Sequence, residues 1–227
     1  MPNREDEKKL AAAASLEYVE SGMAIGLGTG STAECLIRLL GRRIEQGLKV
    51  RAVPTSRRTA ELAKQCGIAL TTLQECPRLD LTVDGADEVD TRLQLIKGGG
   101  GALLREKIVA SASQRMIVIA DSSKLVRRLG AFPLPVEVVP FGWPVVKERL
   151  EEMGAQVSLR RSQGGQLFVS DEGNSILDCR FPSIPNPPEL ALRISPVAGV
   201  VEHGLFIDRC DLALIGQGGQ VERLARG

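Results

Sequence analysis

Residues 23–33 read Met23-Ala24-Ile25-Gly26-Leu27-Gly28-Thr29-Gly30-Ser31-Thr32-Ala33. The mostly apolar residues at the start predict a short strand over residues 23–27, and the glycines after them predict a loop. Residues 32–46 then predict an amphipathic helix, because apolar side chains such as Leu36 and Leu40 recur at helical spacing. A strand, a loop and a helix in this order form one unit of an α/β fold.

The same order of elements repeats on both sides of this unit. The predicted strands cover residues 23–27, 50–53, 79–83 and 116–120, and the predicted helices cover residues 6–19, 32–46, 56–67 and 102–111. Such alternation is typical of a mostly parallel sheet flanked by helices, so we expect an α/β, Rossmann-like fold.

The pattern changes at Phe132-Pro133-Leu134-Pro135, where two prolines interrupt any helix and favour an extended crossing. Beyond it, strands are predicted over residues 136–139, 156–159, 166–169 and 175–178, and helices over residues 145–153 and 189–194. This order predicts an inserted, smaller α+β domain, ferredoxin-like, with an antiparallel sheet and two helices. Residues 204–207 and 212–215 are expected to return to the first sheet. The predicted domains are therefore residues 1–132 plus 204–227, and residues 133–203.

Composition argues against several classes of protein. The chain has 227 residues, a net charge of +1, one Trp, one Tyr and five Phe, whereas nucleic-acid binding calls for clustered basic residues with aromatic side chains. No apolar stretch approaches the roughly 20 residues of a membrane span, and residues 3–9 are polar where a secretory signal is apolar. We therefore expect no nucleic-acid partner and no membrane.

Five cysteines and one histidine limit the covalent and metal chemistry. The cysteines form no C-x-x-C pair, and their odd number fits a disulfide framework poorly. With His203 as the single histidine, a Cys/His zinc site is not expected, and a structural role for His203 is favoured. Five reduced thiols predict a cytoplasmic protein.

Three polar loops, which cover residues 26–32, 84–87 and 97–101, each follow a predicted apolar segment. In open parallel sheets, ligands bind outside the carboxyl ends of the strands, near the point where the strand order reverses. We therefore expect the three loops to meet in one active site.

The first loop offers amides and hydroxyls at the start of a helix, where a phosphate group binds favourably. The residues concerned are Thr29, Gly30, Ser31 and Thr32. The loop lacks the Gly-Lys-Ser/Thr of a P-loop. It matches a loose G-x-G-x-x-A pattern, but the second strand ends in Val53-Pro54-Thr55-Ser56, without the acid that holds a dinucleotide ribose. Dinucleotide binding and a purely structural turn remain the alternatives to phosphate binding.

The second loop, Asp84-Gly85-Ala86-Asp87, places two acids directly after an apolar strand. Ionised carboxylates are strong acceptors for sugar hydroxyl groups. An EF-hand is excluded because Ala86 occupies a ligand position. An Asx-turn with a helix cap is the structural alternative.

The third loop, Lys97-Gly98-Gly99-Gly100-Gly101, precedes Glu106. This segment can supply a cation, a nest of amide donors and a carboxylate base, which favours proton transfer beside a developing oxyanion. The alternative is a glycine-rich hinge with Glu106 on a solvated helix face.

Six motifs together resemble ribose-5-phosphate isomerase of the A type. They are Gly28-Thr29-Gly30-Ser31-Thr32, Asp84-Gly85-Ala86-Asp87-Glu88, Lys97-Gly98-Gly99-Gly100, Arg105-Glu106-Lys107, Ala120-Asp121-Ser122-Ser123-Lys124 and Phe132-Pro133-Leu134-Pro135-Val136-Glu137-Val138. The resemblance covers nearly the whole chain.

This resemblance implies an enzyme that interconverts ribose 5-phosphate and ribulose 5-phosphate through an enediolate, without a metal or an organic cofactor. It implies Glu106 as the proton acceptor, with Lys97, Asp84 and Asp87 around the sugar. It also implies a homodimer or homotetramer. The full implied set of substrate contacts is Lys8, Thr29, Gly30, Ser31, Thr32, Asp84, Gly85, Ala86, Asp87, Lys97, Gly98, Gly99, Gly100 and Lys124.

One position departs from the family pattern, and two other functions stay open. Leu104 stands where relatives usually have threonine, so a hydroxyl contact is missing there. A sugar-phosphate-sensing regulatory domain could share the fold, although the chain shows no helix-turn-helix and retains Glu106 and Lys97. A nicotinamide-dependent oxidoreductase would need the ribose-binding acid that the second strand lacks.

Overall fold

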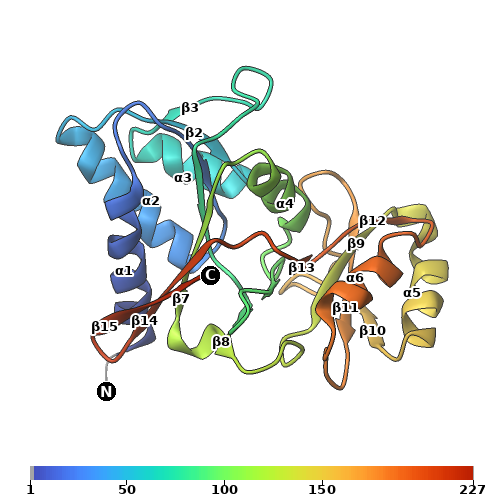
Figure 1. Ribbon diagram of the computed structural model, residues 1–227. Coiled ribbons are helices and arrows are strands. Elements are labelled where there is room, and N and C mark those ends of the chain that lie inside the picture. Colours follow the sequence, from blue (N-terminus) through green and yellow to red (C-terminus); the bar gives the residue numbers. More distant parts are fainter. Residues whose placement is uncertain (1–2, 227) are drawn as a thin grey trace.

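The computed structural model describes residues 3–226, which form three β-sheets and the helices that cover them (Figure 1). The helices are α1 (Arg4–Ser15), α2 (Ser31–Glu45), α3 (Arg57–Gln65), α4 (Leu103–Ser111), α5 (Trp143–Glu152) and α6 (Pro187–Ile194), with short 3-10 turns η1 (Leu16–Tyr18), η2 (Ser122–Lys124) and η3 (Pro140–Gly142). The predicted α/β class with a mostly parallel sheet is confirmed.

The largest sheet has seven strands in the order β15-β14-β7-β4-β1-β2-β3. All neighbouring pairs are parallel except β14 and β15. Its strands are β1 (Ala24–Leu27), β2 (Arg51–Pro54), β3 (Ala69–Leu70), β4 (Leu81–Asp84), β7 (Met116–Asp121), β14 (Leu212–Gln217) and β15 (Gln220–Ala225). The strand order reverses between β1 and β4, so a ligand site is expected beyond Leu27 and Asp84.

The side chains of the central strand β7 alternate between the two faces of this sheet, and helices cover both faces. Ile117 and Ile119 pack into a core with α1, α2 and α3, while Val118 and Ala120 face a second core that includes Ala110 of α4. Successive residues of a strand point to opposite faces, so a continuous apolar run is buried on both sides. Figure 1 shows α1 and α2 on one side of the sheet and α4 on the other.

The second sheet is antiparallel, with the order β10-β11-β9-β12, and it is covered by α5 and α6. Its strands are β9 (Leu134–Val138), β10 (Gln156–Leu159), β11 (Ser175–Arg180) and β12 (Val200–His203). Their chain order with the two helices is the ferredoxin-like arrangement expected from the sequence. Pro135 lies within β9 rather than before it. The domain boundaries at residues 132/133 and 203/204 remain a prediction.

A third sheet, β13-β6-β5-β8, lies between the other two in Figure 1 and corrects one expectation. Its strands are β5 (Glu88–Asp90), β6 (Leu95–Ile96), β8 (Leu125–Val126) and β13 (Leu205–Phe206). Residues 212–215 do return to the first sheet within β14, but Leu205 and Phe206 pair with β6 instead. The loop that begins at Lys97 therefore follows a strand of this small sheet and not a strand of the parallel one.

The strand predicted over residues 166–169 is wrong. Only an isolated bridge joins Leu167 to Arg161 in this region. Leu167 and Val169 are mostly exposed, so their apolar alternation has no core to face. Phe168 alone is half-buried, and the segment is a loop.

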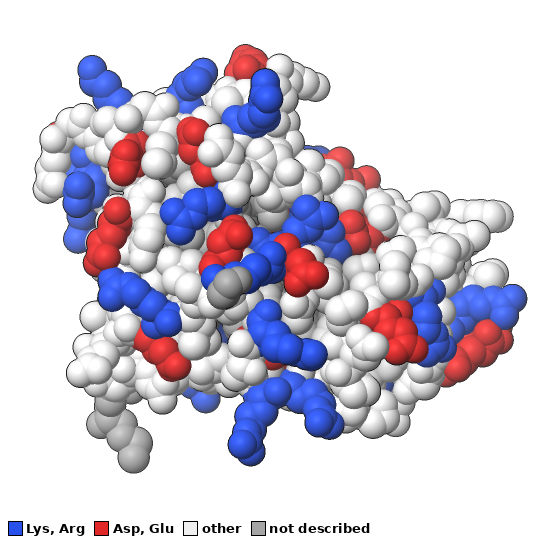
Figure 2. All heavy atoms as spheres, viewed as in Figure 1, with Lys and Arg blue, Asp and Glu red and all other residues white. Residues whose placement is uncertain are grey.

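The surface and the cysteines agree with the composition. Acidic and basic side chains are interspersed over the face shown in Figure 2. All five cysteines lie within the described part of the chain, and each is a free thiol. Across residues 3–226, no helix has both the length and the apolar character that a membrane crossing requires.

Gly216 provides a test of the packing of α1 on β14. A Cβ atom at this position would lie 2.0 Å from the backbone oxygen of Glu7, which cannot swing aside as a side chain can. We expect Gly216→Ala to lower the free energy of unfolding by roughly 1–3 kcal/mol, as overpacked cores do. Urea unfolding would measure the change. The control is Gly164→Ala, where the nearest atom is a serine hydroxyl at 3.9 Å; equal stability of both variants would contradict the packing described.

Candidate active site

A cavity of about 230 Å³ lies where the three polar loops meet. It is bordered by the loops after β1 and β4, by the glycine loop, defined here as residues 97–101, and by Glu106 of α4. The residues that line it are Arg4, Lys8, Thr29, Gly30, Ser31, Thr32, Gly85, Ala86, Asp87, Lys97, Gly98, Gly99, Gly100, Glu106, Asp121, Ser123 and Lys124. The structure thus brings the predicted site residues together, and Asp84 is the one that does not reach the lining.

The N-terminus of α2 opens into this cavity. The helix begins at Ser31, and its capping position is Gly30, which has a φ of 117° and supplies no side-chain cap. The first amide groups of a helix have no partner within the helix, and the helix dipole favours negative charge there. Ser31 and Thr32 add hydroxyl groups at the same end. This arrangement suits a phosphate group.

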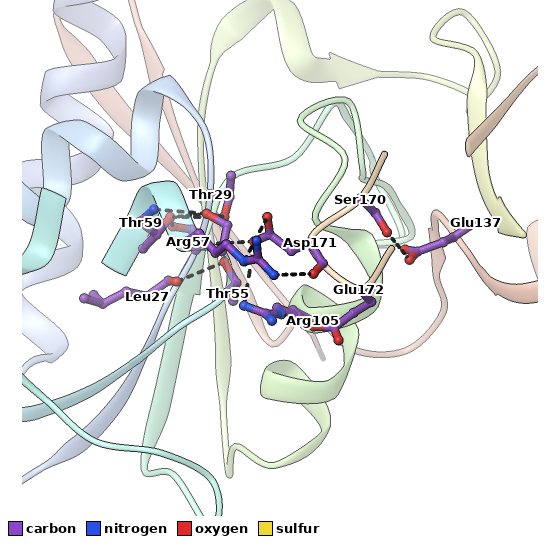
Figure 3. Close-up of polar contacts among 12 residues, drawn as sticks. Leu27, Thr29, Thr55, Arg57, Thr59, Arg105, Glu137, Ser170, Asp171 and Glu172 are labelled. Atoms are coloured by element: carbon purple, nitrogen blue, oxygen red, sulfur yellow. Dashed lines mark hydrogen bonds and ion pairs between the residues drawn. The ribbon is translucent and has the colours of Figure 1, made fainter. Parts of the chain in front are cut away.

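A cluster of hydroxyl groups holds Thr29, the residue before this helix end (Figure 3). Thr29 Oγ1 lies 2.8 Å from Thr55 Oγ1, 2.9 Å from Ser56 Oγ and 3.1 Å from Thr59 Oγ1. Thr59 donates in turn to the carbonyl oxygen of Gly28 at 3.0 Å. These supporting residues were not predicted from the sequence, although Thr55 and Ser56 stand at the carboxyl end of the second parallel strand, where a dinucleotide-binding fold has an acid.

Lys97, Asp84 and Glu106 form a buried group of one cation and two carboxyl groups. Lys97 Nζ lies 2.9 Å from Asp84 Oδ2 and 3.4 Å from Glu106 Oε1. It also donates to the carbonyl oxygen of Gly85 at 2.5 Å. Asp84 Oδ1 accepts hydrogen bonds from the amides of Thr29 and Gly85. Asp84 is fully buried, so it fixes Lys97 and two cavity loops from beneath.

The two carboxyl groups differ in their partners, and this difference decides where a proton resides. Burial raises the pKa of Asp84 overall, although Lys97 at 2.9 Å and two amide donors oppose this effect. Burial, and then the charge of Asp84, raises the pKa of Glu106 to about 8 against the weaker opposing effect of Lys97. For Lys97, burial lowers the pKa, but the charges of Asp84 and Glu106 outweigh it and raise the pKa overall. Lys97 therefore stays charged beside Asp84, and the pKa of Glu106 lies in a range where its carboxyl group can both accept and release a proton.

Asp87 binds the glycine loop at the rim of the cavity. Its Oδ2 atom accepts a hydrogen bond of 2.7 Å from the amide of Gly99. Unlike Asp84, Asp87 is partly exposed and lines the cavity. A carboxylate so placed can reach a ligand hydroxyl group as well as the loop.

Two of the predicted basic side chains, Lys8 and Lys124, line the cavity. Lys8 lies in α1, 2.6 Å from Glu5, and Lys124 lies over the ring of Phe132 at 6.0 Å. Arg4, Asp121 and Ser123 also line the cavity and were not singled out as site residues. For Asp121 and Ser123 a signal was available, because Asp121 ends β7, a strand of the parallel sheet, and Ser123 follows it.

Two other positions considered from the sequence lie outside this lining. His203 is buried, with its Nε2 atom 3.2 Å from Ser195 Oγ, and burial, reinforced by Lys107, lowers its pKa to about 4. Leu104 lies instead beside Glu137 and Ser170 in a separate small pocket. No group of three or more His, Cys, Asp or Glu side chains within residues 3–226 is placed to hold a metal ion.

The loop before β11 of the second sheet contacts α3 and α4 through Asp171 and Glu172 (Figure 3). Asp171 Oδ2 accepts a 2.7 Å hydrogen bond from the backbone amide of Arg57 and lies 3.7 Å from Arg105 Nη1. Arg105 also pairs with Glu172. These contacts link the helix that carries Glu106 to the helix that supports Thr29.

Comparison with known proteins agrees with this geometry. Residues 51–220 match the family described as ribose 5-phosphate isomerase A (phosphoriboisomerase A). Ribose-5-phosphate isomerase A of Parvibaculum lavamentivorans is 53% identical over 220 residues, which cover 94% of this chain and 95% of the relative.

Solved structures are similar over almost the whole chain. A D-ribose-5-phosphate isomerase in complex with phospho-erythronic acid has a TM-score of 0.96 at 38% identity, with 99% of this chain and 100% of that chain covered. Ribose 5-phosphate isomerase A from Methanocaldococcus jannaschii has a TM-score of 0.94 at 43% identity, with 98% and 100% covered. The chain therefore belongs to the ribose 5-phosphate isomerase A family.

Proposed function

We propose that the protein interconverts D-ribose 5-phosphate and D-ribulose 5-phosphate through an enediolate intermediate. The observation that carries this proposal is the buried carboxyl group of Glu106, which shares one cavity with the Lys97 ammonium, the glycine loop and an uncapped helix N-terminus. Membership of the isomerase family supports the same substrate pair. The reaction belongs to the non-oxidative part of pentose phosphate metabolism.

In this mechanism Glu106 is the general base. Its carboxylate removes the proton from C2 of the open-chain aldose and returns it to C1, so that no proton is gained or lost overall. A positioned base of this kind contributes about 10²- to 10⁴-fold to the rate. The raised pKa of Glu106 suits this role, because the group can hold the proton in the intermediate and give it up again.

Lys97 and the amides of the glycine loop stabilise the oxyanion that forms on the carbonyl oxygen. Lys97 is held in place by Asp84 and by the Gly85 carbonyl oxygen, so it needs little rearrangement during the reaction. Donors fixed in advance are worth on the order of 10²- to 10³-fold each. Asp84 acts from behind the cavity wall, whereas Asp87 lines the cavity and is the better placed carboxylate to relay a hydroxyl proton.

The phosphate group is proposed to bind at the N-terminus of α2. Thr29, Gly30, Ser31 and Thr32 provide amides and hydroxyls, and Lys8 and Lys124 provide positive charge at the same cavity. The phosphate group takes no part in the bond changes, so these donors anchor the substrate and do not act on the reacting carbons.

The decisive experiment is a conversion assay of ribose 5-phosphate without any added cofactor and with a chelator present. Run in D₂O and followed by NMR, the assay should show deuterium entering at the reacting carbons, because an ionisable carboxyl group exchanges its proton with solvent. Absence of conversion would overturn the proposal. Saturable binding of NAD(P) would favour an oxidoreductase instead.

We also propose a cytoplasmic location and a homodimeric or homotetrameric assembly. The free state of all five cysteines supports the first proposal. Sedimentation of the purified protein would determine the second.

Glu106→Gln should leave the fold intact while it removes the base. The substitution keeps the shape of the side chain and removes one of two carboxyl charges that share Lys97. We expect the turnover to fall at least ~100-fold, with phosphosugar binding nearly unchanged. Steady-state kinetics with Glu61→Gln, an exposed position on α3, provide the control. Wild-type turnover in Glu106→Gln would exclude Glu106 as the base.

The pH dependence of kcat/KM should report the ionisation of Glu106. The base acts only when it is deprotonated, so a pKa of about 8 predicts that kcat/KM rises with pH below that value and levels off above it. The second ionisation of a phosphate ester lies near 6, so the two steps are separable. A profile that is flat from pH 6.5 upward would contradict a raised pKa for Glu106.

Replacement of Ser31 and Thr32 by Ala should chiefly raise KM. The two hydroxyls lie at the helix end, and the phosphate they bind is not involved in the bond changes. We expect kcat to stay within about threefold of the wild type. The Glu106→Gln variant in the same assay gives the opposite pattern, and a loss confined to kcat in the Ser31/Thr32 variant would contradict the phosphate assignment.

A further inference from the structure

Arg160, the residue after β10 of the second sheet, reaches across to the glycine loop. Its Nη1 atom donates to the carbonyl oxygens of Gly98 at 2.8 Å and Gly99 at 3.2 Å. Only 11% of its side chain is exposed. A long basic side chain that is this well buried, and bonded to two successive carbonyls, is held in one conformation.

The remainder of the guanidinium group is fixed within its own sheet. Arg160 Nε donates to Asp178 Oδ2 at 3.0 Å, and Nη2 pairs with Asp178 Oδ1, so the ion pair is bidentate. Asp178 lies on β11 opposite Ser158 of β10. The ring of Phe168 lies 5.8 Å from the Arg160 Cζ atom. A bidentate pair of this kind orients the planar group that reaches the loop.

Phe168 also connects this assembly to the loop directly. A Cβ atom added at Gly101 would lie 2.3 Å from the Phe168 ring, so the ring is in close contact with the backbone there. Gly101 donates its amide to the Gly98 carbonyl oxygen at 2.9 Å and closes a turn. The second sheet thus holds the loop through both a hydrogen-bonding group and an aromatic ring.

The bonds from Arg160 determine which way the loop amides point. In a trans peptide the C=O of one residue and the N–H of the next point in opposite directions. With the Gly98 C=O held by Arg160, the Gly99 N–H points away from Arg160 and donates to Asp87 Oδ2 at 2.7 Å. With the Gly99 C=O held likewise, the Gly100 N–H also points away from Arg160, and Gly100 lines the active-site cavity.

We propose that Arg160 is a positioning residue, which holds the Gly98 and Gly99 carbonyls so that the Gly99 amide binds Asp87 and the Gly100 amide faces the oxyanion of the enediolate. This inference rests on the proposed function. Asp178 and Phe168 act through Arg160 and the loop, and none of the three lines the active-site cavity. Without Arg160, the Gly98 carbonyl oxygen still accepts the Gly101 amide, but the peptide between Gly99 and Gly100 can rotate. It would then present the Gly99 carbonyl oxygen, which repels the developing negative charge.

The test compares Arg160→Met with Arg161→Met. Arg161 is the adjacent residue, is exposed, and bonds through its side chain to Gly165 rather than to the glycine loop. For Arg160→Met we expect kcat to fall about 10-fold or more, with the KM for ribose 5-phosphate within about twofold of the wild type. Arg160→Lys, which keeps one donor, should recover part of the loss. Arg161→Met should behave as the wild type.

Inhibition by phospho-erythronic acid separates positioning from general damage. Its carboxylate presents two oxygens as an enediolate does, so its inhibition constant should rise in proportion to the loss of kcat, while the KM stays nearly constant. The amide NMR signals of Gly99 and Gly100 should shift in Arg160→Met. A merely structural role would lower the folded fraction without changing the ratio of inhibition constant to KM in the folded protein.

Three outcomes would overturn the proposal: a kcat for Arg160→Met within twofold of the wild type, an equal loss in Arg161→Met, or an unchanged inhibition constant for phospho-erythronic acid. If Arg160→Met fails to fold, Asp178→Asn is used in its place, with a smaller loss in the same direction expected and wild-type kinetics contradicting the proposal. Failure of the proposed function differs from failure of the Arg160 proposal, because in the first case the wild-type protein itself would show no conversion of ribose 5-phosphate.

Discussion

One buried ammonium group shared by two carboxyl groups is the constraint around which the site is built. Lys97 leaves the third sheet, Asp84 ends a strand of the parallel sheet, and Glu106 stands in the first turn of α4. Two ionised carboxylates beside one cation would leave excess negative charge in a medium that solvates it poorly. Asp84 has the closer contact with Lys97 and two amide donors, whereas the pKa of Glu106 is raised to about 8, so Glu106 is the member that we propose to titrate.

Much of the fold could be predicted from the sequence, because the signals are local. The buried runs at β1, β4 and β7 and the helical spacing in α2 mark the parallel sheet, and the loops at its reversal point mark the cavity. Short strands paired only by long-range contacts gave no such signal. Leu205 and Phe206 are apolar enough for either sheet, and their pairing with β6 depends on residues more than a hundred positions away.

The sequence predicts which residues gather at the site, but not which of them line the cavity and which lie behind its wall. Carboxylates and glycines at strand ends identify the residues that line a cavity, yet nothing in the sequence separates Asp84, fully enclosed, from Asp87, which is partly exposed. The hydroxyl cluster around Thr29 and the arginine beneath the glycine loop were missed for the same reason. Their side chains are common surface types, and only the fold shows that they are enclosed.

Asp171 joins two helices that are made much earlier during synthesis of the chain. Arg57 and Arg105 are translated long before the acidic residue that joins them. A ribosome-bound chain that ends ahead of Asp171 already contains Glu106 and the loop around Thr29, but it lacks the link between α4, which carries Glu106, and α3, which supports Thr29. The link between α3 and α4 therefore forms only when the final quarter of the 227-residue polypeptide is being made.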